Sequence, residues 1–308
     1  MVAALTKARR RRLPAARRNW SLIAGCVLAA LIVLAAIFRG LIEPYAPGAE
    51  YLNQTLQGPS ASHLLGTDSL GRDELSRVIA GLSWSLGVTS IAVAISGFLG
   101  TTIGLIGAGW SGWPRAIVRR VMDFGIAFPF LVIAVVIIVV VGHGFLALSV
   151  TLGVVSWPIF SRVTFAEGIA AAERDYVLAA RLMGVSTLRR VLRHILPTIR
   201  GTILVMLAFM FADLILVEAA LSFVGLGAPL GTPTWGNMLY ESEQYMVQAP
   251  WLLAAPGIAI VIVVIAANLL GDGLAAYTGR SSQARTRRGR LRRLLGKPLP
   301  VASEPTTS

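Results

Sequence analysis

The sequence predicts an all-α membrane protein with six transmembrane helices. Hydrophobic residues make up 55% of the 308-residue chain and charged residues only 14%, and its mean hydropathy is +0.71. Because a soluble domain carries roughly 25% charged residues, lipid is expected to be the main solvent. Several runs contain the roughly 20 apolar residues that a helix needs to cross a bilayer. These runs lack the alternation of barrel strands, so their backbones must form helices to satisfy their hydrogen bonds in lipid.

Charged residues and glycines divide the chain into these spans. The first apolar run has no charge before Arg39, and the second lies in an uncharged stretch that ends at Arg115. A third uncharged stretch, 38 residues between Asp123 and Arg162, is long enough for two crossings. Glycines near its middle favour a tight turn there. The six spans are therefore predicted at residues 20–42, 84–108, 124–141, 145–160, 201–220 and 251–270.

The distribution of Lys and Arg predicts the orientation. The predicted inner segments, 1–19, 109–123, 161–200 and 272–308, carry 7, 3, 7 and 8 of these residues. The predicted outer segments, 39–83, 142–144 and 221–250, carry 3, 0 and 0. Cytoplasmic loops are enriched in Lys and Arg, so both termini and the 161–200 loop are expected in the cytoplasm.

This orientation divides the chain into three parts. A basic tail at 1–19 and a second, disordered basic tail at 280–308 flank a transmembrane domain at 20–279, whose first outer segment is 43–83. Basic tails that adjoin apolar runs are expected to hold the chain ends at the membrane surface and to contact anionic lipid, not nucleic acid. A lone cysteine excludes an internal disulfide.

A polar, basic stretch at 173–197, ERDYVLAARLMGVSTLRRVLRHILP, lies between apolar runs. Its first eleven residues favour a helix, and Gly184 supplies the left-handed backbone that ends one. Ser186 can cap a second helix, which Pro197 would end. The expected shape is a compact knob with the small side chains of Ala179 and Ala180 near its apex, where a partner could approach closely. The alternative is an amphipathic helix in the membrane interface.

The spacing within this stretch resembles the cytoplasmic coupling loop of ABC-importer permeases, although Leu178 stands where the general pattern has Glu. Three further stretches resemble the second permease subunit, the C component, of dipeptide, oligopeptide and nickel importers. They follow the family's order, at 65–77 (LGTDSLGRDELSR), 218–239 (beginning EAALSFVGLG and ending TWGNML) and 268–274 (NLLGDGL). The sequence departs from the family pattern in two places. Trp84 replaces a frequent basic residue, and Ala-Ala-Tyr at 275–277 replaces the usual Arg-Asp and Asp-Pro.

The resemblance implies the six-helix bundle of type I ABC importers (MetI-like) in a bacterial inner membrane. It implies a non-catalytic subunit for import of di- or oligopeptides, with nickel chelates or haem as alternatives. The implied partners are a homologous B-type permease, one or two ABC ATPase subunits (or one fused ATPase) that bind ATP and Mg, and an extracytoplasmic solute-binding protein. The residues that it implies for ATPase coupling are Asp175, Tyr176, Ala179, Ala180, Arg181, Gly184, Ser186, His194 and Pro197.

The other candidate residues lie in the fifth span and in the first outer segment, and most of them are acidic. Acids within spans usually face an interior or a cavity. Asp213 and Glu218, with Met206 and Met210, are therefore candidates to line the pathway and meet a peptide's amino end. Glu218 could instead cap local backbone near the outer end of its span. The outer candidates are Asp68, Arg72 and Asp73, whose segment is either a docking surface for a binding protein or a lid packed on the bundle.

Other functional classes lack their sequence signatures. No stretch matches the P-loop pattern, G-x-S-x-G or H-E-x-x-H, so neither catalytic residues nor a bound cofactor are expected in this chain. His63, His143 and His194 are not spaced as metal ligands. A secondary transporter is the main rival, but it would show inverted repeats with broken helices, and matching halves are not evident. A structural scaffold is a third option.

Overall fold

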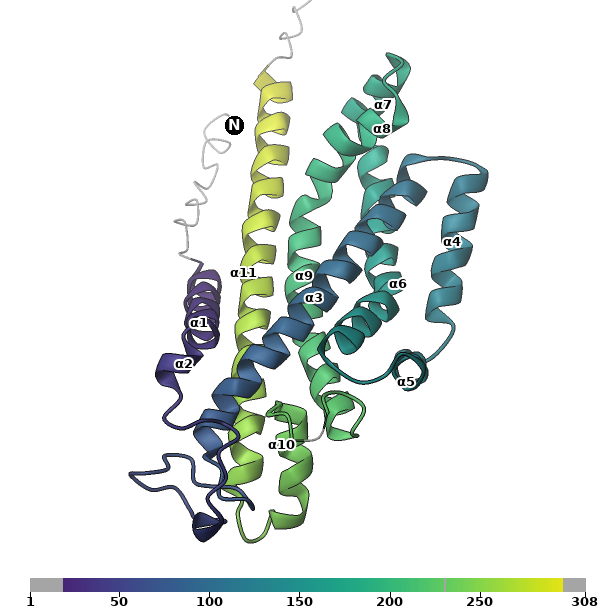
Figure 1. The fold of residues 1–308 in the computed structure, drawn as a ribbon. Coiled ribbons are helices and arrows are strands. Elements are labelled where there is room, and N and C mark those ends of the chain that lie inside the picture. The colour runs from purple at the N-terminus through teal and green to yellow at the C-terminus, as the bar shows by residue number, and fades with distance from the viewer. Residues whose placement is uncertain (1–18, 230, 296–308) are drawn as a thin grey trace, which may run out of the picture.

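The structure, a computed structural model, describes residues 19–229 and 231–295. Within them it contains helices and no strand, only an isolated bridge between Thr67 and Asp73, which confirms the all-α class. The helices are α1 (Trp20–Ile37), α2 (Arg39–Ile42), α3 (Glu74–Gly109), α4 (Trp113–Ile126), α5 (Phe130–Val141), α6 (Phe145–Ala172), α7 (Asp175–Leu182), α8 (Thr187–Arg190), α9 (Leu196–Phe223), α10 (Trp235–Ser242) and α11 (Trp251–Leu295) (Figure 1).

Five helical stretches in the described residues are long and apolar enough to cross a membrane, and a bent pair supplies a sixth. The five contain α1, α3, α6, α9 and α11, and the pair is α4 with α5, which meet at 83°. The expectation of one unbroken third span at 124–141 is therefore wrong. Pro129 directly precedes α5, and the residue before a proline disfavours helical backbone. Most of the predicted inner segment 109–123, including Arg119, is part of α4.

Several other helices are longer than the sequence predicts. Helix α3 begins at Glu74, because the Asp73 carboxylate accepts the Ser76 backbone N–H at 2.8 Å and caps it. Helix α6 continues to Ala172, so the segment between the fourth and fifth spans is shorter than 161–200. Helix α11 continues to Leu295, where a disordered tail was expected. The basic residues 1–18 and the last part of the tail, 296–308, lie outside the described residues.

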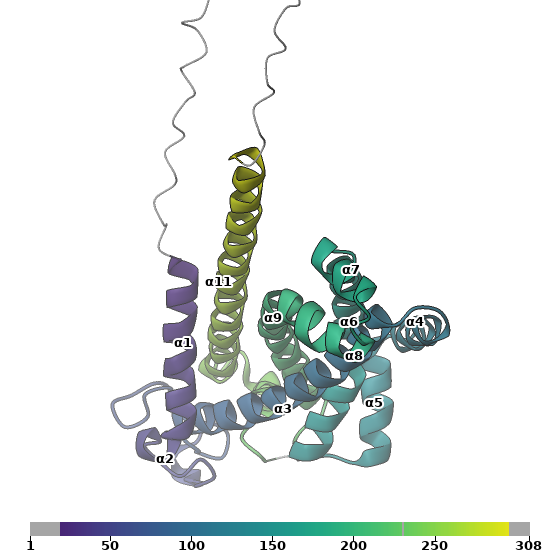
Figure 2. The same ribbon diagram turned by 90° about the horizontal axis from the view of Figure 1, so that it is seen from above.

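The two ends of the bundle differ in what they carry. The α7–α8 segment and the far end of α11 lie at one end, and α10 and residues 43–73 lie at the other (Figure 1). Figure 2 shows α7 and α8 side by side next to α6. Among the described residues, the basic α7–α8 segment and the far end of α11 therefore lie at the same end of the bundle.

The most extensive helix packing among the described residues is between α3 and α6. A Cβ added to Gly100 would lie 2.8 Å from Phe160 Cβ, and one added to Gly104 would lie 2.7 Å from Ser161 O. Only glycine fits at both positions, as in the small-xxx-small contacts of membrane helices. The backbones of the two helices therefore touch directly along one turn.

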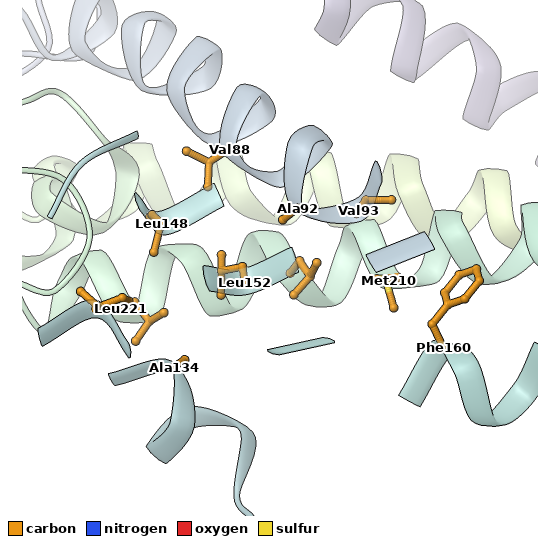
Figure 3. Close-up of a cluster of buried hydrophobic side chains, with 11 residues drawn as sticks. Val88, Ala92, Val93, Ala134, Leu148, Leu152, Phe160, Met210 and Leu221 are labelled. Atoms are coloured by element: carbon orange, nitrogen blue, oxygen red, sulfur yellow. The ribbon is translucent and has the colours of Figure 1, made fainter. Parts of the chain in front are cut away.

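A buried apolar cluster joins α3, α5, α6 and α9 (Figure 3). Val88 of α3, Leu152 of α6 and Met210 of α9 are among its members. A second cluster joins α3, α9, α10 and α11 around Ile215 and Trp235. Helices α3 and α9 belong to both clusters, so they connect the two parts of the core.

Candidate functional site: the knob between α6 and α9

The knob comprises residues 173–195, and its first helix has charges suited to its ends. Asp175 lies in the first turn of α7 and Arg181 in the last, which the helix dipole favours. Gly184 follows with φ +78°. Its N–H donates to Arg181 O and the Val185 N–H donates to Ala180 O, each at 3.1 Å. These two bonds form a Schellman motif, which ends α7 where the sequence predicts.

The second half of the knob differs from the prediction. Ser186 occupies the N-cap position of α8, but its hydroxyl makes no capping bond. A π-helical turn, Val191–Ile195, then leads directly into α9. Pro197 does not end a helix but lies in the first turn of α9, where the missing proline N–H is tolerated. The second half of the knob therefore continues into α9 as helix, with no loop between them.

Apolar side chains hold the knob on the bundle. Val177 of α7 is buried in a cluster with Val191 and Ile195 of the π turn and Leu105 of α3, and Ala180 of α7 is also buried. The expectation that Ala180 lies at the apex is thus wrong, because it faces inward while Ala179 is exposed.

Polar contacts join α7 to the start of α9. The Tyr176 hydroxyl lies 2.6 Å from Thr198 Oγ1. The Tyr176 ring also meets His194 edge to face, with the ring centroids 6.3 Å apart. Two of the residues expected in coupling therefore connect the knob to the span that follows it.

The exposed tip consists of Leu182 and Met183, whose side chains are 89% and 75% exposed. Leu188 and Leu192, further along the knob, are also more than half exposed, and Arg189 between them in the sequence is exposed too. An exposed apolar patch rimmed by charge marks an interaction site. None of these residues is among the predicted coupling residues, although the position of Leu182 and Met183 next to the helix-ending glycine could have indicated them.

The outer candidates lie inside the chain, which agrees with the expected alternative of a lid packed on the bundle and leaves their side chains little surface for docking. Asp68, Arg72 and Asp73 are at most 6% exposed. Arg72 donates to Asp68 at 2.6 Å and to Glu241 at 2.9 Å. Arg77 donates to Glu241 at 2.6 Å and also to Asp68. Buried charges require such pairing, and this four-residue network, called the outer clamp below, packs the segment on α3 and α10.

Asp73 pairs with His63 instead. The His63 Nδ1 lies 2.9 Å from Asp73 Oδ1. In the part of the chain that the structure describes, no three His, Cys, Asp or Glu side chains are grouped as a metal site would require. His63 thus serves the packing of the outer segment.

The four pathway candidates have different surroundings. Glu218 is fully buried and accepts hydrogen bonds from Ser85 Oγ at 2.8 Å and Ser222 Oγ at 3.1 Å. Met210 is buried in the core, and Met206 packs against the same cluster. Asp213 alone of the four is exposed on α9. It is therefore the candidate whose side chain another molecule can reach.

These features define a polytopic helical membrane protein that presents a knob at its basic end. The family of binding-protein-dependent transport system inner membrane components matches residues 100–282, more than half of the chain. The chain belongs to this family and is a permease subunit of an ABC-type import system, as the coupling-loop resemblance predicts.

Named relatives align over most of this chain. It is 35% identical over 258 residues, 84% of its length and 85% of the relative's, to the dipeptide transport system permease protein DppC of Alkalihalophilus pseudofirmus. It is 37% identical to the di/tripeptide permease DppC of Pseudomonas aeruginosa, over 83% of this chain and 86% of the relative. It is 36% identical to the glutathione permease GsiD of Escherichia coli, over 84% and 86%.

Proposed function

We propose that the chain is the C-type permease of a binding-protein-dependent importer of di- or oligopeptides, and that an ATPase docks on the knob. The observation that carries this proposal is the exposed Leu182–Met183 tip on a knob whose buried residues pack against α3, α6 and the start of α9. The peptide and glutathione permeases among its relatives support the substrate class. ATP and Mg are bound by the ATPase, and this chain supplies no catalytic group.

The knob can transmit force because it is joined to α9 at several points. Its buried residues pack on the π turn, and Tyr176 reaches Thr198 in the first turn of α9. Helix α9 then continues to Phe223 near the opposite end of the bundle. Movement of an ATPase would displace the knob, and α9 would carry that displacement across the membrane.

The remaining partners follow from this role. A homologous B-type permease completes the pathway in the bacterial inner membrane, with both termini of this chain in the cytoplasm. A solute-binding protein docks at the end that carries α10. The outer clamp supports this arrangement, since it holds residues 68–77 firmly against α10.

Asp213 is proposed to meet the solute. A carboxylate within a membrane span usually faces a cavity or a partner, and Asp213 is exposed in the single chain. The ammonium group of a peptide is the charge that it would pair with. Glu218 is proposed to have a structural role, because its carboxylate is buried between two serine hydroxyls.

Co-purification tests the proposal. The tagged chain, solubilised gently from its native membranes, should bring down a second permease, an ATPase and a binding protein, and the ligand of the binding protein should be a peptide. A nickel chelate or haem in that binding protein would change the substrate class. Recovery of the chain alone, with solute movement in ATP-free vesicles, would identify a secondary transporter instead.

A further inference from the structure

A cavity of about 520 Å³ lies at the end of the bundle opposite the knob. It is bounded by the α2 region, by one face of α3, by the first residue of α6 and by the loop before α10. Its lining includes Arg39, Glu43, Ser83, Trp84, Phe145 and Pro233. The cavity thus combines two opposite charges with aromatic and proline walls.

Polar groups around the cavity lack partners. Glu43 Oε1 and Trp84 Nε1 are buried atoms without a hydrogen-bond partner among the described residues. None of the ion pairs in that part of the chain includes Arg39 or Glu43. A buried polar atom without a partner costs about 1–3 kcal/mol. A bound ligand that donates to the carboxylate and accepts from the indole would satisfy both groups.

The two charged residues lie one helical turn apart. The Glu43 N–H donates to Arg39 O at 2.8 Å, and side chains four positions apart project from the same side of a helix. Arg39 and the Trp84 indole can bind an anionic group, and Glu43 can accept from an ammonium. The site therefore suits a ligand that carries both charges a few bonds apart.

The surroundings indicate that this ligand comes from the bilayer. Leu41 of α2 is 85% exposed, and Phe38 and Ile42 beside it are about half exposed. These residues directly follow the first membrane span, so α2 lies where lipid headgroups begin. Tryptophan is enriched at this level of membrane proteins. A dissolved solute would not need the exposed apolar rim that α2 provides.

We propose that the cavity binds the headgroup of an aminophospholipid, such as phosphatidylethanolamine, from the adjacent leaflet. Arg39 and Trp84 Nε1 hold its phosphate and Glu43 accepts its primary ammonium. The acyl chains lie on Phe38, Leu41 and Ile42. This site is independent of the transported solute and would secure the first span against α3.

Native mass spectrometry of the full chain, purified with its accompanying subunits and delipidated, tests the proposal. Phosphatidylethanolamine should bind about tenfold more tightly than phosphatidylcholine with the same acyl chains, because the choline nitrogen has no N–H to donate to Glu43. Glu43→Gln should abolish this preference. Arg39→Gln should weaken binding of both lipids, and Arg39→Lys should restore most of it.

Glu50→Gln is the matched control, since Glu50 is an exposed carboxylate of the same outer segment and its loss should change neither affinity. An unchanged lipid preference in Glu43→Gln would overturn the proposal. Displacement of phosphatidylethanolamine by the dipeptide alanyl-alanine, in the wild type but not in Glu43→Gln, would also overturn it and assign the cavity to a dissolved solute.

Discussion

The Glu218 carboxylate in α9 accepts a hydrogen bond from the Ser85 hydroxyl in α3 at 2.8 Å. This bond joins two helices whose residues lie 133 positions apart in the sequence. Ser222, one turn further along α9, donates to the other carboxylate oxygen. Because Glu218 is fully buried, these two hydroxyls are its hydrogen-bond partners in the core.

Glu218→Ala should destabilise the chain. The substitution leaves two buried hydroxyls without an acceptor, which costs about 1–3 kcal/mol each, and it opens a cavity. The midpoint of thermal unfolding of the purified complex should fall by several degrees. The control is Glu243→Ala, which removes an exposed acid from the short 3-10 helix Glu243–Tyr245 after α10 and should leave the midpoint unchanged. An equal loss in both variants would contradict the structural role of Glu218.

Gly184→Asp should abolish ATPase stimulation while the protein still inserts. A Cβ at this position meets no atom within 4 Å, so the folding cost is confined to the left-handed backbone, about 1 kcal/mol. Gly184→Asn has the same shape without the charge, and asparagine tolerates this conformation. Stimulation should therefore be largely kept by the Asn variant and lost in the Asp variant. Normal stimulation with Asp would exclude Gly184 from the ATPase contact.

Leu182→Ser should weaken the association with the ATPase. The loss of one exposed leucine from an interface costs about 1–3 kcal/mol, so co-purified ATPase should drop about tenfold or more. Val247→Ser is the control, because Val247 is an equally exposed apolar residue, 97% exposed, in the loop that follows α10. If both variants retain the ATPase, the tip of the knob is not its docking surface.

Asp68→Asn should loosen the outer segment. It leaves Arg72 and Arg77 buried with one carboxylate between them, and breaking a buried ion pair costs about 3–5 kcal/mol. Limited proteolysis should then cut residues 43–73 faster than in the wild type. Glu50→Gln again provides the comparison, and equal cutting rates would show that the outer clamp does not hold this segment.

Asp213→Asn should reduce uptake of peptides with a free amino end. A charge-assisted hydrogen bond to a carboxylate contributes about 1.5–3 kcal/mol, so transport should fall about tenfold. N-acetylated peptides lack the ammonium and should be transported equally by variant and wild type. The same loss for both kinds of peptide would assign Asp213 to packing against a partner subunit.

Composition and local pattern were sufficient for much of this structure. Long uncharged runs predicted the spans of α1, α3, α6, α9 and α11, because crossing a membrane depends on length and apolarity alone. Gly184 predicted the end of α7, since a left-handed residue strongly favours glycine. The family followed from the coupling-loop spacing together with three other ordered motifs.

Features that depend on tertiary contacts were not predictable in this way. The outer clamp pairs Arg77 with Glu241, 164 residues away, and local pattern cannot show such a partner. Ala180 is buried while its neighbour Ala179 is exposed, and a pair of alanines in the sequence cannot show which of them faces inward. The break before Pro129 had a local signal, but the apolarity of the run outweighed it.

The contact at Gly100 and Gly104 has a mechanical consequence. At these two positions α3 has no side chain that could slide or rearrange against α6. We therefore expect α3 and α6 to behave as one rigid unit of the subunit. Helix α9 contacts them through flexible side chains such as those of Met206 and Met210, so we expect any rearrangement to occur at this contact and not between α3 and α6.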